Sequence, residues 1–329
     1  MLSKKIGIDL GTSTILVYVK GEGVVVNEPA LMATDGKGGR VLAIGRAASQ
    51  LVLRGGKART VRPVRDGNGV DYGVAGAMLQ HLIGRIVGRQ RIFRPDVMLS
   101  VAPMVTGVER RAVLEATMQA GAKTAYLIDK PMAAAIGAKV AVSTTDGIVV
   151  VNLGAGSTDM AVIALGEIVA MEAIPVGGEA LNRAIEAAVA QTHGAQLEPG
   201  DAERLKLEIG SAVIPSTETV IELNADGKAA LRVSGREVQA AMREPLEAIA
   251  AGLQRLLAQV PEGRRTAVHR NGLVLSGGGA QLRGIAEFLA ARTGTPVRVA
   301  RDPQSCVAVG TGMALDNMQV VRRGQHYIT

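Results

Sequence analysis

The chain has 329 residues, 47% of them hydrophobic, which is enough apolar material for two folded domains. Its aromatic residues are four Tyr and two Phe, so binding of single-stranded nucleic acid by base stacking is disfavoured, and we expect no nucleic-acid partner. The net charge of +7 is compatible with nucleic acid, an anionic membrane surface or nucleotide phosphates, and composition alone does not choose among them. The single Cys306 excludes an internal disulfide and favours a reducing cytoplasm.

The chain opens with a glycine-containing hairpin. Ile6 to Leu10 and Ile15 to Val19 are strand-like runs, and Gly11, Thr12 and Ser13 lie between them. Glycine lets a backbone approach a ligand closely, and successive N–H groups at such a tip form a concavity that binds anions. The alternative is an ordinary hairpin without a ligand. Met1 to Lys5 leads directly into the first strand, so no signal peptide is expected, and no apolar run reaches membrane-spanning length.

The rest of the first half alternates between helix and strand patterns. Thr106 is the expected cap of the third helix, and Pro131 lies in the first turn of the fourth. The predicted helices are 43–52, 74–87, 107–120 and one that begins at 131, and the predicted strands are 96–101 and 125–128.

A basic loop joins the second helix to the following strand. Ile92 and Phe93 stand at its tip among arginines, which suits insertion between anionic lipid headgroups. The alternative is that both side chains pack beneath the loop. The basic tail at Arg322 and Arg323 either assists membrane binding or is merely solvated.

The second half repeats the opening pattern. A buried strand from Gly147 to Leu153 leads to a tip of Gly154, Ala155, Gly156, Ser157 and Thr158, and a second strand resumes at Met160. One such hairpin is unspecific. Two of them predict a pair of similar domains that grip one phosphate chain.

Helices and strands alternate again after this second hairpin. Gly277, Gly278 and Gly279 follow a strand and open a helix, where a backbone could approach a phosphate or a base; a plain loop is the alternative. The predicted helices are 179–191, 199–210, 236–260 with an interruption at Pro245, 282–293 and 307–316, and the strand-like segments are 219–233, 272–275 and 297–300. The order of elements predicts two α/β domains in tandem.

Together these motifs make the chain resemble the MreB/Mbl family, the bacterial rod-shape proteins of the actin-like ATPase superfamily. The resemblance runs nearly end to end. Besides the two hairpins, it rests on the blocks at 27–29, 62–63, 66–67, 109–113, 120–123, 131–137, 177–179, 202–210, 275–280, 302–303 and 306–312.

The resemblance implies an actin-like fold of two domains, each with a core and a smaller subdomain, around a nucleotide cleft. The first domain would comprise residues 1–145 and a C-terminal helix in 312–329, with its small subdomain at 33–65. The second would comprise 146–311, with its small subdomain at 182–245.

It also implies ATP and Mg²⁺ as ligands. Asp9, and Asn152 in the second half, would reach the metal through water. The phosphates would be held by Gly11, Thr12, Ser13, Gly154, Ala155, Gly156, Ser157 and Thr158. The ribose and adenine would be bordered by Gly177, Gly178, Glu179, Glu203, Lys206, Gly277, Gly278 and Gly279. For Glu203 and Lys206, one helical turn apart, an ordinary solvated surface pair is the alternative.

The sequence departs from the family pattern at the reaction centre. The family has a glutamate that positions the attacking water directly before the Pro-Met-Ala-Ala-Ala block, and here that residue is Lys130, preceded by Asp129. A protonated lysine has no acceptor atom, so it cannot orient or deprotonate water. Asn152 stands where the family has an aspartate, and Ala155 replaces a glycine. We therefore predict that nucleotide binds while hydrolysis is slow or absent, unless Asp129 takes over the role.

As a function, the resemblance implies a membrane-associated filament that helps to determine cell shape. Its partners would be other copies in head-to-tail, paired protofilaments, the inner face of the cell membrane through the loop with Ile92 and Phe93, and membrane proteins of cell-wall elongation. The alternatives are a nucleotide-dependent regulator or scaffold that does not polymerise, and a small-molecule kinase of the same fold.

Overall fold

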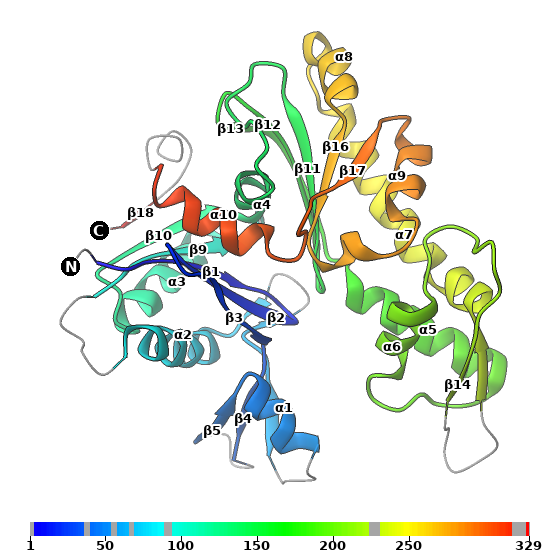
Figure 1. Ribbon diagram of the computed structural model, residues 1–329, viewed down its shortest axis with the longest axis horizontal. Helices are drawn as coiled ribbons and strands as arrows, with labels where there is room; N and C mark the ends of the chain where they lie inside the picture. The colour runs from blue at the N-terminus through cyan, green and yellow to red at the C-terminus, as the bar shows by residue number, and fades with distance from the viewer. Residues whose placement is uncertain are drawn as a thin grey trace.

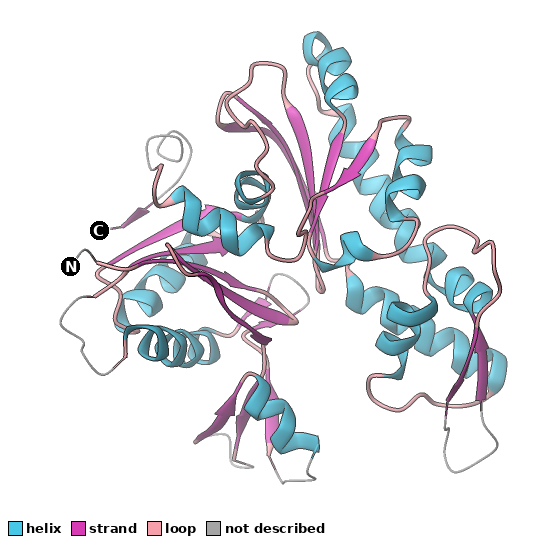
Figure 2. Cartoon of the chain, in the orientation of Figure 1, coloured by secondary structure: helices cyan, strands magenta, loops and turns pink. Residues whose placement is uncertain are grey.

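The computed structural model describes residues 3–35, 40–53, 58–65, 69–88, 94–223, 231–317 and 327–328. Figure 1 shows two lobes, each built on a twisted sheet and each with a smaller group of elements at its lower end. Figure 2 shows helices on both faces of each sheet, which confirms the predicted α/β class. Among the described residues, no helix is both long and apolar enough to span a membrane.

The first sheet is mixed and has the order β18-β10-β9-β1-β2-β3. β1 pairs with β2 in an antiparallel and with β9 in a parallel arrangement, so the hairpin lies beside the crossover strands. Its strands are β1 (Lys5–Leu10), β2 (Thr14–Val19), β3 (Gly23–Pro29), β9 (Asp96–Val101), β10 (Thr124–Asp129) and β18 (Tyr327–Ile328).

The second sheet repeats this topology. Its order is β13-β12-β11-β16-β17, with β11 antiparallel to β12 and parallel to β16. The first hairpin therefore corresponds to the second, and the crossover strands correspond as well. Its strands are β11 (Ile148–Leu153), β12 (Thr158–Ala164), β13 (Glu167–Ile174), β16 (Leu273–Ser276) and β17 (Val297–Val299).

Two central helices, α4 (Lys130–Gly137) and α10 (Cys306–Ala314), lie between the sheets (Figure 1). Side chains alternate across a strand, so each sheet has two buried faces. Met98 of β9 and Val150 of β11 face the core around α4 and α10, whereas Val97 and Val149 face outer cores. The two hairpins are thus held against one common support.

The outer cores are closed by the remaining helices. In the first lobe α2 (Tyr72–Val87) and α3 (Gly107–Gln119) pack on the sheet, and Thr106 caps α3 in a capping box with Glu109, as predicted. The second lobe uses α5 (Gly178–His193), α6 (Asp201–Ile209), α7 (Gly235–Ala258), α8 (Glu262–Asn271) and α9 (Ile285–Thr293).

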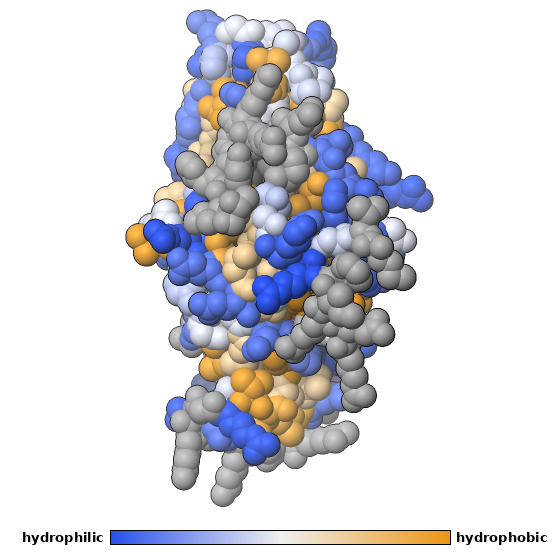
Figure 3. All heavy atoms as spheres, turned by 90° about the vertical axis from the view of Figure 1, so that its left-hand side faces the viewer, coloured by the Kyte–Doolittle hydropathy of each residue, from blue (hydrophilic) through white to orange (hydrophobic). Residues whose placement is uncertain are grey.

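Smaller elements extend each lobe downward in Figure 1. The first lobe adds β4 (Met32–Thr34), β5 (Val41–Ile44), α1 (Arg46–Leu53), β6 (Arg59–Val61), β7 (Val64–Arg65) and β8 (Gly69–Val70). The second adds the antiparallel pair β14 (Val220–Leu223) and β15 (Leu231–Ser234). Figure 3 shows the face at the left of Figure 1, where hydrophilic residues predominate and hydrophobic residues gather toward the lower end.

Several predicted boundaries were wrong. Residues 43 and 44 end strand β5 rather than begin a helix, because Gly45, with φ of 66°, turns the chain before α1. Helix α7 continues through Pro245, since buried apolar residues on both sides of the proline hold it against the sheet. The helix predicted at 282–293 begins at Ile285 after a short 3-10 helix, η1 (Gly278–Gln281).

The helix α10 near the C-terminus lies where it was predicted. It spans Cys306–Ala314, close to the predicted 307–316, whereas most of the segment 312–329 that the resemblance adds to the first domain lies outside the described residues. The helix α8 and the strand β18 were not predicted at all. Arg322 and Arg323 lie outside the described residues, as do Ile92 and Phe93.

Candidate functional site

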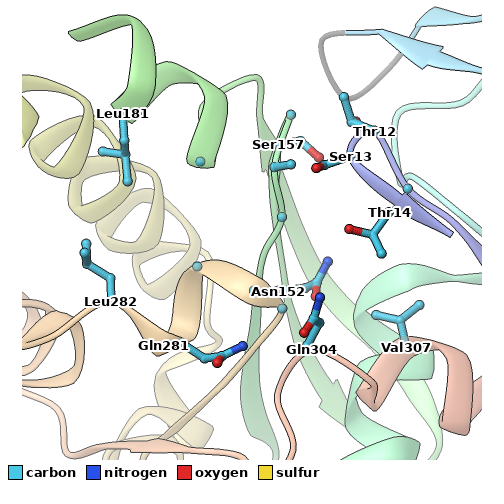
Figure 4. Close-up of a pocket in the computed structure, with 18 of the residues that line it drawn as sticks. Thr12, Ser13, Thr14, Asn152, Ser157, Leu181, Gln281, Leu282, Gln304 and Val307 are labelled. Carbon is cyan, nitrogen blue, oxygen red and sulfur yellow. The ribbon is translucent and has the colours of Figure 1, made fainter. Parts of the chain in front are cut away.

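A cavity of about 420 Å³ lies between the two lobes, where the hairpin tips face each other. Figure 4 shows Thr12, Ser13 and Thr14 on one side of it, Leu181 and Leu282 on the opposite side, and Asn152 and Gln304 between them. The predicted residues that line it are Asp9, Gly11, Thr12, Ser13, Lys130, Asn152, Gly154, Ala155, Gly156, Ser157, Gly178, Glu203, Lys206, Gly277, Gly278 and Gly279. Residues far apart in the sequence therefore share one cavity.

The two tips have the same turn. The Gly11 N–H donates to the Thr14 carbonyl at 3.0 Å, and the Gly154 N–H donates to the Ser157 carbonyl at 2.9 Å. A Cβ atom would lie 2.6 Å from the carbonyl oxygen of Thr14 at the first glycine and 2.9 Å from that of Ser157 at the second. Neither turn can accept a larger residue without moving backbone, so the glycines are required for the tip geometry.

A small polar cluster forms the floor of the cavity. The Asp9 carboxylate accepts a hydrogen bond of 2.7 Å from the Ser100 hydroxyl and lies 3.6 Å from the Lys130 ammonium, Oδ1 to Nζ. Both charged side chains are largely buried, with 14% and 12% of their surface exposed. Asn152 accepts from the Ser276 hydroxyl at 3.3 Å.

Asp159 completes this cluster, although it was not among the predicted site residues. It pairs across the strands with Asn152 and is 1% exposed. Burial raises the pKa of the Asp159 carboxyl, and the nearby Asp9 charge acts in the same direction. The Lys130 ammonium and hydrogen bonds from Ser157 and Asn152 oppose that rise in pKa. The floor thus combines two carboxyl groups with one ammonium group.

The opposite end of the cavity is less polar. Leu181 and Leu282 contribute apolar surface there. A Cβ atom on Gly278, which also lines the cavity, would meet nothing within 4 Å. Lys206 crosses this end and donates to the Gly178 carbonyl at 3.1 Å. Burial lowers the pKa of Lys206, and the carboxylates of Glu203 and Glu179 oppose that shift. Glu203 and Lys206 are therefore part of the cavity wall, which argues against the simple surface pair.

Four predicted residues do not line the cavity. Asp129 forms an ion pair with Arg110 at 2.5 Å on the other side of the α4 start. The Thr158 hydroxyl donates to the Val176 carbonyl at 2.7 Å. Gly177 is the N-cap of α5 and packs against the backbone of the second tip. Glu179 binds Arg62, which also reaches the carbonyl of Thr12.

The structure adds residues that sequence reasoning missed. Asp159 directly follows the second tip, so its position in the motif was an available signal. Gln281, Arg283 and Gln304 also line the cavity, but no motif pointed to them. Arg62 was noted only as part of a block. Its contacts join the two lobes, and pairing between distant segments leaves no local pattern in one sequence.

The described part of the chain contains no group of three or more His, Cys, Asp or Glu residues arranged to hold a metal ion. The only predicted donors at the floor are the Asp9 carboxylate and the Asn152 amide. Mg²⁺ in proteins needs only one or two carboxylates when substrate phosphates supply further ligands. The protein alone therefore offers an incomplete metal site.

Comparison with known proteins agrees with this geometry. The family model described as MreB/Mbl protein matches residues 3–323. The cell shape-determining protein MreB of Pasteurella multocida is 38% identical over 96% of this chain and 94% of its own. The cell shape-determining protein Mbl of Bacillus subtilis is 34% identical over 97% of both chains.

Among solved structures, MreB5 of Spiroplasma citri bound to ADP is similar to this chain with a TM-score of 0.90 and 28% identity. The superposition covers 98% of this chain and 99% of the other. The same MreB5 has also been solved with AMPPNP, with a TM-score of 0.89 over 97% and 98% of the two chains. The predicted actin-like fold is confirmed by this likeness.

Proposed function

The chain belongs to the MreB/Mbl family, and from this premise we propose that it is an ATP-binding, filament-forming protein that helps to determine cell shape. The observation that carries the proposal is the pair of matching glycine turns, which meet across one cavity. Each turn directs its backbone toward the same space, so a chain of phosphates can bridge the two lobes. The ADP-bound and AMPPNP-bound MreB5 structures support a nucleotide as the ligand.

Within this proposal the nucleotide lies across the cavity. Its β- and γ-phosphates face Gly11, Ser13, Gly154 and Ser157, and its adenosine lies at the end with leucine side chains. Lys206 there already donates to backbone, and its partner Glu203 offers a carboxylate to the ribose or base.

We propose that hydrolysis is weak. Lys130 lies on the cavity floor, where the family glutamate would orient water, and an ammonium group offers no acceptor. Asp129 is a poor substitute, because Arg110 holds its carboxylate at 2.5 Å and the side chain does not line the cavity. The carboxyl groups of the floor itself are Asp9, which lies beside the Lys130 ammonium, and Asp159, whose raised pKa disfavours the charged base form.

Mg²⁺ fits this site only in part. It would arrive with the phosphates and contact Asp9 through water, as the family resemblance implies. The ammonium of Lys130 stands 3.6 Å from the same carboxylate oxygen, and Asn152 contributes no charge. Asp9 and the phosphate oxygens can hold such an ion, but the pocket supplies less negative charge than two free carboxylates would.

The proposal extends to assembly and location. Copies would join head to tail into paired protofilaments on the inner face of the cell membrane, with membrane proteins of cell-wall elongation as partners. Membrane contact rests on Ile92 and Phe93 in the sequence alone. The division at residues 145/146 is likewise proposed, with the two sheets as the cores of the two domains.

Electron microscopy of the purified protein with ATP tests assembly directly. Filaments are expected, and particles that remain monomeric at all concentrations would favour the non-polymerising regulator.

Phosphate release from the purified protein with Mg-ATP tests hydrolysis, and its rate should remain far below that of a glutamate-bearing relative. Release at the relative's rate would overturn weak hydrolysis. Co-sedimentation with anionic liposomes should fall when Ile92 and Phe93 are both changed to Ser, and unchanged binding would refute the role of that loop.

A further inference from the structure

The Lys130 ammonium lies on the floor of the cavity, close to the Asp9 carboxylate. Its Nζ atom is 3.6 Å from Asp9 Oδ1, and its side chain is 12% exposed. Its charge also acts on the buried Asp159. The lysine therefore faces both carboxyl groups of the floor while it lines the cavity between the two tips.

The backbone fixes this position. Lys130 is the first residue of α4, directly followed by Pro131, and α4 is packed between both sheets. Asp129 precedes it and forms an ion pair with Arg110, and neither of these two residues lines the cavity. The ammonium is thus supplied from a rigid element rather than from a loop.

We propose that Lys130 replaces the divalent cation as the neutralising charge for the nucleotide phosphates, so that ATP binding does not require Mg²⁺. This inference rests on the proposed function, since it concerns the same site. An ammonium group donates up to three hydrogen bonds and binds phosphate oxygens strongly as a point charge. Three features of the floor agree with it: the ammonium beside Asp9, the uncharged Asn152, and the deep burial of Asp159.

The Lys130 ammonium makes the binding of a second cation near Asp9 unfavourable. A metal ion at Asp9 would have to share the carboxylate with Lys130, and two cations a few ångströms apart repel each other in a largely buried site. When the phosphates enter, Lys130 can turn from Asp9 toward them without any ion from solution. The nucleotide then meets a positive charge that is part of the chain.

The test is ATP binding to the full chain, measured by calorimetry in excess Mg²⁺ and again in EDTA. For the unchanged protein we expect the Kd to change less than about 3-fold between the two conditions. Lys130→Met should lose about 10- to 100-fold in affinity in EDTA, the loss of a charged hydrogen-bond donor, and regain part of it with Mg²⁺. Lys130→Glu should bind ATP only with Mg²⁺, and Lys130→Arg should keep binding in EDTA.

Lys123→Met serves as the matched control, because Lys123 is exposed and does not line the cavity. Thermal unfolding of each variant checks that the fold is retained. A second readout is the number of Mn²⁺ ions bound per ATP complex, followed by electron paramagnetic resonance. We expect less than one ion per complex in the unchanged protein and one in Lys130→Glu.

The outcomes separate the two proposals. ATP binding that collapses in EDTA in the unchanged protein would overturn the role of Lys130 and leave the proposed nucleotide site intact. Binding in EDTA that survives Lys130→Met without loss would also overturn it. No ATP binding in either condition would overturn the proposed function together with this inference.

Discussion

The two glycine hairpins share a backbone but differ in where each keeps its carboxylate. Asp9 and Asn152 occupy equivalent places, each two residues before the glycine of its turn. Across the strands, Asp9 pairs with Leu16, whereas Asn152 pairs with Asp159. In the first hairpin the acid is on the leading strand opposite an apolar residue, and in the second it is on the returning strand opposite an amide.

The two halves therefore share the geometry of the turn but not the position of the carboxylate. The turn depends only on a glycine and one backbone hydrogen bond, and both halves have them. The charge is not repeated. Both acids line the cavity, but Asp9 keeps 14% of its side chain exposed beside Lys130, while Asp159 is 1% exposed and pairs across the strands with Asn152. The proposed phosphate site therefore uses a turn from each half, while the charged groups of its floor are arranged differently in the two halves.

The largest expected effect comes from breaking what the hairpins share. Gly11→Ala and Gly154→Ala should each lower the free energy of unfolding by about 1–3 kcal/mol, because the added Cβ atom meets backbone. ATP affinity should fall with them, and Gly11→Ala should be the more harmful, since its clash distance is 2.6 Å rather than 2.9 Å. Urea unfolding and calorimetry measure both effects.

Gly84→Ala in α2 is the control for this comparison. A Cβ atom there meets nothing within 4 Å. The change should stabilise the protein by about 0.5–1 kcal/mol, since alanine favours helix more than glycine does. Wild-type ATP affinity in both hairpin variants would show that the tips do not hold the phosphates.

A second prediction transposes the acid and amide of the second hairpin. Asn152→Asp places a second carboxyl beside the buried Asp159 and should cost about 1–2 kcal/mol of unfolding free energy. Adding Asp159→Asn should recover most of that loss, because the double variant again has one carboxyl group and one amide in this pair, with their positions exchanged between the two strands. Urea unfolding of the two single variants and the double variant gives the coupling free energy. Strictly additive effects would mean that the two side chains do not interact.

The sequence predicted the turns of this site better than its charges. The Gly-rich tips are local patterns, so Gly11 to Ser13 and Gly154 to Ser157 could be found from neighbouring residues, and the structure brings them together. Asp159 directly follows the second tip, so its position could be found from the sequence, whereas its burial depends on the pairing of β11 with β12. The departure at Lys130 was visible only against the family pattern.

In the fold, too, local sequence patterns were predicted better than features that depend on tertiary contacts. Strands with continuous apolar runs were found, while the end of β5 was mistaken for helix because Ala43 and Ile44 carry no local signal against it. The pairing of β5 with β4 decides that segment, and this pairing is a tertiary contact. At Pro245 a local signal predicted an interruption that the structure does not have, because the packing of α7 outweighs the missing hydrogen-bond donor of the proline.

A third prediction concerns the contact that joins the two halves. Arg62 binds Glu179 across the cleft at 2.5 Å, with 43% and 27% of the side chains exposed. Because solvent screens such a pair, Arg62→Ala and Glu179→Ala should show a coupling of only about 0.2–1 kcal/mol in a double-mutant cycle on ATP binding. The exposed pair Arg204 and Glu208 on α6 is the control and should leave ATP binding unchanged. If the variants of both pairs lost ATP affinity equally, the Arg62–Glu179 contact would have no specific role in ATP binding.

The smallest expected effect tests whether the halves move on their common support. Cys306 begins α10, is 3% exposed, and has a pKa raised to about 11 by burial and by the Asp302 carboxylate. At pH 8 only about one thiol in 1,000 is then ionised, and the labelling rate should rise about tenfold per pH unit up to pH 10, because the thiolate is the nucleophile. Cys306 is the only cysteine of the chain, so the rate of thiol labelling is unambiguous. ATP should slow labelling at every pH without changing this slope, since a ligand bound to both hairpins holds the lobes against α10. If ATP left the labelling rate unchanged, a ligand at the two hairpins would not be restraining the central helices.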